Sequence, residues 1–230
     1  MTNYKKYLYP FTSVMIILFF LLACVHFWCY NEAFYRHEHE SLTLYGKSIA
    51  EHIGISDEEL ADLTHFTLIY LNDPQASLDR QMVIKGEMRE VFTDDEKLHM
   101  EDVRRLNLAA NYICIVSGIF SLIVLIMVIR NRDLDTFYFY FKKALLYLGV
   151  VFGILGAWVF IDFDSFWTFF HHIFFAGNEL WLLDLRTDIL IMIVPPEFFD
   201  HLVITIFFSF IILTGIFYLG LRYFALKGQR

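Results

Sequence analysis

Two histidines in this chain stand where a proton-transfer site could form. His99 follows Thr93-Asp94-Asp95-Glu96, a threonine cap with Glu three residues later, so a helix is predicted to begin there and to run on into a long apolar segment. His171 lies within 165–178, a strip of 14 residues that is rich in Phe and holds no Lys, Arg, Asp or Glu. Imidazole titrates near neutral pH and can therefore act as a general acid or base. A lone histidine at a membrane surface is more often a packed ring, so the residues alone leave catalysis and packing open.

The composition places these histidines in an integral membrane protein. Of the 230 residues, 57% are hydrophobic and 19% aromatic, and the mean hydropathy is +0.51. Soluble domains contain about 45–50% apolar residues on a comparable count. The composition also excludes a disordered chain, a collagen-like chain and a disulfide scaffold, and the net charge of −8 argues against a nucleic-acid-binding protein.

Four apolar segments are long enough to cross a bilayer as helices, which takes about 20 residues each. They predict an all-α membrane protein with four transmembrane helices, an extracellular cap and an interfacial or re-entrant aromatic segment. The predicted parts are 1–30 (N-terminus and first span), 31–107 (cap), 108–129 (second span), 130–143 (cytoplasmic loop), 144–161 (third span), 162–201 (extracellular aromatic segment), 202–221 (fourth span) and 222–230 (cytoplasmic tail).

The distribution of charge predicts the orientation, because Lys and Arg collect in the loops on the cytoplasmic side. The two chain ends and the 130–143 loop together hold nine basic residues and two acidic ones, whereas the cap holds eight basic and 17 acidic ones. Both termini are therefore expected in the cytoplasm of a multi-pass cell-membrane protein. His99 and His171 are expected on the outer side, nine residues before the second span and ten residues after the third.

The outer regions contain further structural signals. Ser56-Asp57-Glu58-Glu59 is a capping box, and the apolar residues after it predict an amphipathic helix that ends before Asn72-Asp73-Pro74. Residues 81–84 suit either a strand or a loop. The aromatic strip is too short to span a bilayer, so it is expected to lie at the interface, with Trp167 and Trp181 at headgroup depth.

The sequence predicts no metal centre and no serine hydrolase site. It lacks the His-Glu-x-x-His zinc motif and the Gly-x-Ser-x-Gly elbow. His37-Glu38-His39-Glu40 resembles a set of metal ligands but stands alone, so a solvated polar face is expected there. Glu96-x-x-His99 is half of a di-iron pattern that needs two copies and additional inward-facing Glu residues.

Small residues in the predicted spans are expected to serve packing. The three cysteines, Cys24, Cys29 and Cys114, have no metal-type spacing and are interpreted as small apolar side chains. Gly149 and Gly153 form a small-xxx-small pair, which predicts a seam where another helix of the same molecule approaches closely.

Two groups of residues resemble the signatures of a known family, the lipoprotein intramolecular transacylases, which are integral membrane enzymes of Gram-positive bacteria. The resemblance covers most of the chain, in the same order along the sequence. The first signature is Phe92-Thr93, Glu96, His99, Asp102-Val103 and Leu106, with Gly54-Ile55-Ser56, Glu59-Leu60 and Tyr70-Leu71 upstream. The second is Phe170-His171-His172-Ile173-Phe174-Phe175, Trp181-Leu182-Leu183-Asp184, Thr187-Asp188-Ile189-Leu190-Ile191 and Pro196-Glu197-Phe198-Phe199.

The resemblance implies an acyl transfer within one lipoprotein molecule. The sn-2 acyl chain of the diacylglyceryl-cysteine would move to the α-amine of the same cysteine, which gives the lyso form. Attack of the amine on the ester carbonyl closes a ring of about eight atoms. Holding the amine and the ester close together is therefore a large part of the catalysis. His99 and His171 would share the roles of general base and acid, with no assignment between them. Further candidates for support or substrate binding are Glu96, Asp102, Phe170, Phe174, Phe175, Trp181 and Asp188.

Some choices remain open at this point. Asp102 could orient the His99 ring or simply face solvent, and His172, next to His171, could be the ring that matches the family. No cofactor and no metal is expected, because ester aminolysis needs neither redox chemistry nor an energy source. The expected partners are a diacylglyceryl-modified lipoprotein N-terminus and membrane lipid, without nucleic acid. The alternatives are a non-enzymatic membrane sensor or accessory protein with a lipid- or partner-binding cap, and an intermolecular acyltransferase that takes its chain from phospholipid.

Overall fold

A computed structural model describes residues 4–228 of the chain. Arg230, one of the basic residues counted for the orientation, lies outside the described residues. The chain forms two compact units. The first, here called the membrane unit, comprises the chain up to Phe27, Ala110–Asp162 and the chain from Ile204. The second, here called the cap unit, comprises Trp28–Ala109 and Phe163–Val203.

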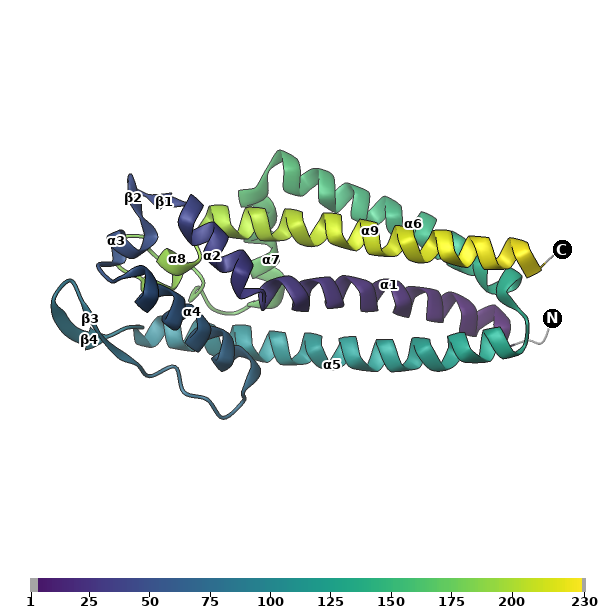
Figure 1. The fold of residues 1–230 in the computed structure, drawn as a ribbon, viewed down its shortest axis with the longest axis horizontal. Helices are drawn as coiled ribbons and strands as arrows, with labels where there is room; N and C mark the ends of the chain where they lie inside the picture. The colour runs from purple at the N-terminus through teal and green to yellow at the C-terminus, as the bar shows by residue number, and fades with distance from the viewer. Residues whose placement is uncertain (1–3, 229–230) are drawn as a thin grey trace. The chain divides into compact units, whose positions relative to one another are not determined.

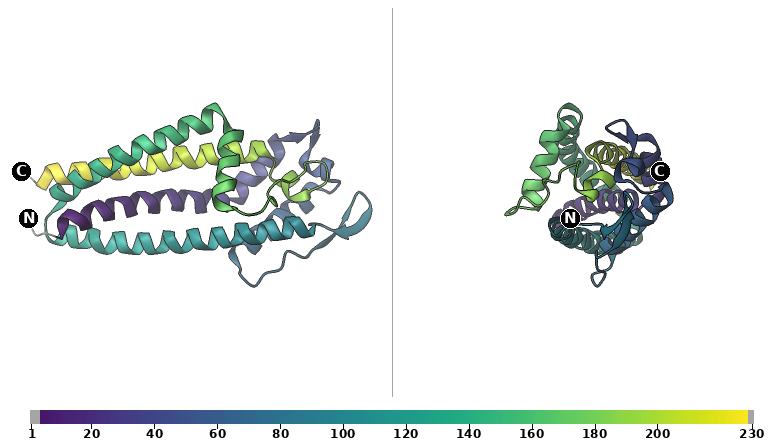
Figure 2. Two further views of the ribbon diagram at one scale, coloured as in Figure 1. Left: turned by 180° about the vertical axis from the view of Figure 1, so that it is seen from behind. Right: turned by 90° about the vertical axis from the view of Figure 1, so that its left-hand side faces the viewer.

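The membrane unit is built from four long apolar helices that run alongside one another (Figures 1 and 2). They are α1 (Lys5–Cys29), α5 (Asp94–Arg130), α6 (Leu134–Ile161) and α9 (Pro196–Gly228). Each is long and apolar enough to cross a membrane. The start of α1 and the end of α9 lie at the same end of this bundle (Figure 1), as an even number of crossings requires. The helix that was predicted to begin after Thr93 is α5, and it continues without a break into the second predicted span.

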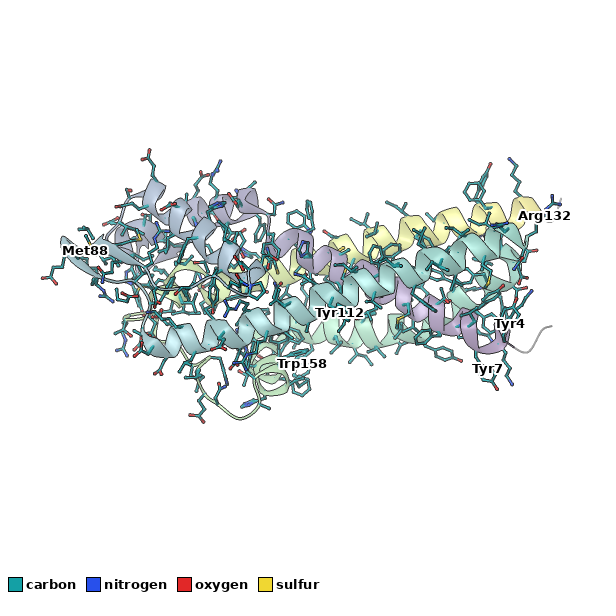
Figure 3. All side chains as sticks on the ribbon, turned by 90° about the horizontal axis from the view of Figure 1, so that it is seen from below. Tyr4, Tyr7, Met88, Tyr112, Arg132 and Trp158 are labelled. Carbon is teal, nitrogen blue, oxygen red and sulfur yellow. The ribbon has the colours of Figure 1, made fainter. Side chains whose placement is uncertain are left out.

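Aromatic residues lie near both ends of the apolar segments (Figure 3). Tyr4 and Tyr7 stand at the beginning of α1, and Tyr7 is exposed. Tyr112 and Trp158 lie near the other end of the unit, where Tyr112 is 70% exposed. Tyr and Trp prefer the two interfaces of a bilayer, because their rings are apolar and their tips polar. The exposed apolar surface between these positions suits contact with lipid.

The glycines that allow close helix packing are not the predicted ones. Gly149 and Gly153 are exposed, and no side chain lies within 4 Å of a Cβ placed on either, so the predicted seam is wrong. A Cβ on Gly118 would instead come within 2.8 Å of the Phe19 ring, and one on Gly156 within 2.6 Å of the Phe207 ring. The spacing of glycines showed that a close approach was possible, whereas the rotation of each helix about its axis decided where it occurs.

The membrane unit holds a partly buried hydrogen-bond network around Asp133, in the turn between α5 and α6. Oδ2 accepts hydrogen bonds from Tyr9 Oη (2.6 Å) and Lys5 Nζ (2.5 Å), and Oδ1 accepts from Thr136 Oγ1 (2.8 Å). Tyr9 is fully buried among apolar side chains. Both carboxylate oxygens therefore have partners, and the network fixes the start of α1 to the α5–α6 turn.

The cap unit combines short helices with two small antiparallel hairpins. The helices wholly within it are α2 (Glu32–Ser41), α3 (Ile49–Ile53), α4 (Asp57–Asn72), α7 (Phe163–Phe174) and α8 (Ile189–Ile193). The hairpins are β1 (Thr43–Leu44) with β2 (Lys47–Ser48), and β3 (Gln81–Ile84) with β4 (Glu87–Glu90). The segment that suited a strand or a loop is thus the strand β3, which turns through Lys85 and Gly86 at positive φ. Ser56 and Glu59 make the predicted capping box of α4.

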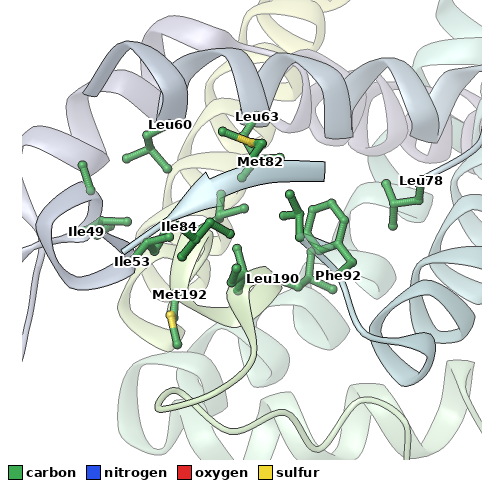
Figure 4. Packing of buried hydrophobic residues seen from close by; sticks show 14 of the residues in the cluster. Ile49, Ile53, Leu60, Leu63, Leu78, Met82, Ile84, Phe92, Leu190 and Met192 are labelled. Atoms are coloured by element: carbon green, nitrogen blue, oxygen red, sulfur yellow. The ribbon is translucent and has the colours of Figure 1, made fainter. Parts of the chain in front are cut away.

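One apolar core holds the cap unit together (Figure 4). Alternate residues of β3, Met82 and Ile84, point into it and meet Leu63 of α4. Leu190 and Met192 of α8 belong to the same core, so it joins the two outer segments that the sequence analysis treated separately. The position of α8 matters for the site, because a side chain on α5 binds its backbone.

The prediction of a solvated face for residues 37–40 is wrong for two of the four side chains. Glu38 is 5% exposed and its carboxylate accepts a hydrogen bond from Nδ1–H of His201 at 2.7 Å. His39 donates from Nε2 to the carbonyl of Ile193 at 2.9 Å. The reason is that α2 is amphipathic and turns this side toward the cap core. Within residues 4–228 no group of three potential ligands could hold a metal ion.

Candidate active site

The first turn of α5 is fixed by a buried carboxylate. Thr93 and Glu96 form the predicted capping box, in which Oε2 of Glu96 accepts from the Thr93 amide (2.6 Å) and hydroxyl (2.8 Å). Oε1 accepts from the backbone N–H of Leu190 in α8 (2.7 Å). Glu96 is fully buried, and this burial raises the pKa of its carboxyl group. Glu96 thus ties α5 to α8, one helical turn before His99.

His171 is the buried residue of the amphipathic helix α7. Its Nδ1–H donates to the carbonyl of Trp167, four residues earlier, at 2.8 Å. The Trp181 ring is stacked on the imidazole with centroids 4.7 Å apart, and the Trp167 ring meets it edge-on, also at 4.7 Å. Because a carbonyl can only accept, the proton of the neutral ring is on Nδ1 and Nε2 carries the lone pair.

The cap unit brings His99 and His171 together. Their ring centroids lie 6.3 Å apart and their planes differ by 27°. Phe175 packs against both rings, at 5.2 Å from His99 and 5.4 Å from His171. Both imidazoles are buried, and Nδ1 of His99 has no hydrogen-bond partner among the described residues. A buried nitrogen without a partner is costly, which is typical of a position that binds a substrate.

Burial keeps both imidazoles neutral. Loss of solvation lowers the pKa of His99 to about 4, with a smaller contribution from the nearby His171 and an opposing one from Asp102. Burial likewise lowers the pKa of His171, although its bond to the Trp167 carbonyl opposes the shift. The pair therefore carries two lone pairs and no net charge at neutral pH. Protonation of one ring disfavours protonation of the other.

The structure places Asp102 beside the site without a bond to His99. Its Oδ2 accepts from Nδ2 of Asn178 at 3.0 Å, and its Oδ1 lies 3.5 Å from Arg105. Asp102 thus acts on His99 by charge, and its hydrogen bond holds the loop after α7. Asn178 was absent from the predicted site, because nothing in the sequence marks a loop amide that meets α5 only in the folded chain.

The predicted aromatic residues divide into two groups. Phe175 is buried and Trp181 partly buried, both in contact with His171, and Phe170 lies edge-on to His171 at 5.6 Å. Phe174, a candidate for support or substrate binding, is 50% exposed and packs on Phe170 rather than on His171. It points away from the pair because it lies three residues, rather than four, beyond His171.

The second histidine of the doublet also faces outward. His172 is exposed, and its ring meets the edge of Trp181 at 5.5 Å. The geometry therefore selects His171 as the ring that pairs with His99. Trp167 was interpreted from the sequence only as an interfacial anchor. It lies four residues before His171, and this spacing could have predicted that the two side chains meet on one helix face.

The family model described as "Lipoprotein intramolecular transacylase Lit" matches residues 11–199. The chain belongs to the Lit family. No curated protein sequence is similar enough to count as a match. The fold agrees with the family: the solved Lit of Bacillus cereus, a membrane-integral protein, has a TM-score of 0.82 at 17% identity, over 100% of this chain and 99% of that one. Solved forms of that protein with one His replaced by Arg or by Ala have TM-scores of 0.75 and 0.76, each at 16% identity, over 98% of this chain and 93% and 95% of theirs.

This Lit family member has a groove of about 410 Å³, and two of its lining residues, Thr93 and Asp95, precede His99 at the start of α5. It is formed by the start of α5 and the loop that follows α7. Its lining mixes leucines with carboxylates: Thr93, Asp95, Asn178, Glu179, Leu180, Leu182, Leu183 and Asp188. The carboxylate of Asp188, a predicted supporting residue, accepts from the Asp184 amide (2.8 Å) and the Thr187 hydroxyl (2.9 Å), so it shapes the loop.

Proposed function

We propose that this Lit family member moves the sn-2 acyl chain of a diacylglyceryl-cysteine to the α-amine of the same cysteine, with His99 and His171 as the proton-transfer groups. The observation that carries the proposal is the meeting of two buried, neutral imidazoles from separate signatures, their ring centroids 6.3 Å apart. Within residues 4–228, neither ring belongs to a group of three side chains that could hold a metal ion. Aromatic side chains surround the pair and exclude water.

The reaction needs a proton to leave the amine and a proton to reach the glyceryl oxygen. The nitrogen attacks the ester carbonyl, a tetrahedral oxyanion forms, the C–O bond to glycerol breaks and an amide remains. A pair of neighbouring neutral imidazoles that takes up at most one additional proton suits this transfer, because the proton taken from nitrogen is available for the leaving oxygen. Nε2 of His171 is the base site, since Nδ1 is committed to the Trp167 carbonyl.

Closure of the ring is the other requirement. The glyceryl and cysteinyl bonds rotate freely, so the amine and the ester rarely meet in the ring of about eight atoms that the attack requires. A rigid site that holds both groups in place therefore supplies much of the rate. The rings of Trp181, Phe170 and Phe175 give such a wall beside His171. The unpartnered Nδ1 of His99 offers a hydrogen bond to the reacting groups.

The site lies on the outer side of the cell membrane in this proposal, and both termini lie in the cytoplasm. Two observations support this orientation. The acidic residues collect in the cap, whereas the basic residues collect at the chain ends and in the α5–α6 loop. A lipoprotein carries its lipidated cysteine on the outer side, where the cap unit would meet it.

The decisive experiment is incubation of the purified protein with a defined diacylated lipopeptide and no other lipid. Acyl transfer leaves the total mass unchanged and moves one chain to the cysteine nitrogen, which fragmentation in a mass spectrometer detects. An unchanged lipopeptide would support a non-enzymatic sensor or accessory protein and contradict the proposal. Labelled phospholipid should contribute no acyl chain, and label in the product would indicate an intermolecular acyltransferase.

A further inference from the structure

The groove is connected to the histidine pair through helix α5. Asp95, His99 and Asp102 occupy positions i, i+4 and i+7 of α5 and therefore share one helix face. Asp95 lines the groove, His99 meets His171, and Asp102 accepts a hydrogen bond from Asn178, which also lines the groove. One helical face thus carries the histidine and one wall of the groove.

The order along α5 tells which part of a substrate the groove would meet. The apolar span begins at residue 108, on the C-terminal side of His99, and Asp95 lies about 6 Å away on the N-terminal side. A lipid-modified cysteine held at His99 has its acyl chains toward the span. Its polypeptide must leave in the opposite direction, past Asp95, and an extended residue covers about 3.3–3.6 Å.

The charge of the groove is negative. Three of its lining residues, Asp95, Glu179 and Asp188, carry carboxylates, and the lining contains no Lys or Arg. Within residues 4–228, neither Asp95 nor Glu179 forms a salt bridge. Nearby basic groups are engaged elsewhere: Lys97 pairs with Asp79 and Glu90, and Arg186 with Asp184. The leucines of the lining provide apolar contact for aliphatic stems.

We infer that this groove binds the polypeptide that follows the lipidated cysteine and prefers a basic side chain two or three residues after it. The inference rests on the proposed function and adds a specificity site to it. A Lys or Arg lays its aliphatic stem on Leu180 or Leu182 and its charge near Asp95 and Glu179, whereas an acidic residue is repelled. The groove chooses among lipoproteins, and the histidine pair performs the same reaction on each.

The test compares diacylated lipopeptides that differ only at the second and third residues after the cysteine, with Lys, Gln or Glu at both. We expect kcat/KM to fall in that order, with about a tenfold ratio between Lys and Glu at low salt. High salt should reduce the ratio, because the charges face solvent. Equal kcat/KM for all three lipopeptides would overturn the groove assignment and leave the proposed function intact.

Variants connect the preference to the groove. Asp95→Asn combined with Glu179→Gln should reduce the Lys-to-Glu ratio to less than about twofold, and Glu179→Lys should reverse the preference. Glu87→Gln removes an exposed charge on the β3–β4 hairpin and is the matched control, which should keep the wild-type ratio. A double variant that keeps the full preference would show that another surface recognises the peptide.

A binding measurement separates failure of the groove from failure of the reaction. The His171→Gln variant should still bind a fluorescent Lys lipopeptide about tenfold more tightly than the Glu version. If no lipopeptide is transacylated but this difference in Kd persists, the groove assignment stands and the proposed function is wrong. If the two lipopeptides bind His171→Gln equally, the groove assignment is wrong.

Discussion

The partly buried Asp133 network and the buried His99–His171 pair are polar clusters, one in each unit, and they differ in how completely their hydrogen bonds are made. Around Asp133, Lys5, Tyr9 and Thr136 satisfy both carboxylate oxygens. In the cap unit, His171 uses one ring nitrogen on a backbone carbonyl, and Nδ1 of His99 has no partner among the described residues.

Under the proposed function, this difference separates a structural cluster from a reactive one. A network with all its partners stabilises the fold and has nothing left to offer a substrate. A buried nitrogen without a partner costs free energy in the free protein, and a substrate that binds it recovers that cost. We therefore expect substitutions at Asp133 to act on stability and substitutions at the histidines to act on the reaction.

The largest effect is expected at the histidine pair. His99→Gln and His171→Gln each keep a polar side chain but remove the titrating group, so kcat for acyl transfer should fall by about 10²–10⁴-fold. Thermal unfolding measured alongside should show a folded protein. Full acyl transfer by either variant would contradict the assignment of that histidine.

A stability effect without a catalytic one is expected at Asp133. Asp133→Ala removes the acceptor from the Lys5 ammonium and the buried Tyr9 hydroxyl, which should reduce the free energy of unfolding by about 1–3 kcal/mol. Denaturant titration in detergent measures this change, and kcat of the folded fraction should stay within about twofold of wild type. Loss of kcat at unchanged stability would contradict the distinction between the clusters.

Trp181 should tune the proton affinity of His171. Its ring face lies on the imidazole and stabilises the protonated form, which partly offsets the loss of solvation. Trp181→Leu removes this stabilisation, so the pKa of His171 should fall further below its ordinary value. The acid limb of the kcat–pH profile should move to lower pH, and kcat above it should fall about tenfold, because a weaker base transfers protons more slowly.

The control for Trp181→Leu is Trp181→Phe, which keeps a smaller aromatic face and should lie between Leu and wild type. A shift of the acid limb to higher pH in Trp181→Leu would show that Trp181 acts mainly by excluding water. The direction of the shift is measured from kcat between pH 4 and 8. The protonated histidine pair is expected to be inactive and the neutral pair active, so the acid limb marks the change between them.

The smallest effect is expected at His172. It is exposed, and its ring contact within the site is with Trp181, so His172→Gln should change kcat by less than about twofold. The same lipopeptide assay measures it. A large loss in His172→Gln, with His171→Gln active, would mean that the doublet turns its other ring toward His99 in solution.

Much of the architecture follows from local sequence. Apolar length predicted the four spans, and the capping boxes at Ser56 and Thr93 predicted the starts of α4 and α5, because both signals act through neighbouring residues. The two signatures also singled out His99 and His171, whose rings the structure brings together. The exposed Gly149 and Gly153, by contrast, show that a local pattern does not decide which face of a helix is covered.

The sequence by itself determined the elements and the chemical types of the site residues: four apolar helices, an acidic cap and histidines in an aromatic setting. Only the tertiary structure decided that His171 rather than His172 meets His99, that Glu96 binds the α8 backbone, and that Asp102 holds Asn178. The physical reason is distance along the chain. His99 and His171 are 72 residues apart, and the environment that keeps both rings neutral exists only after α5, α7 and the following loop have packed together.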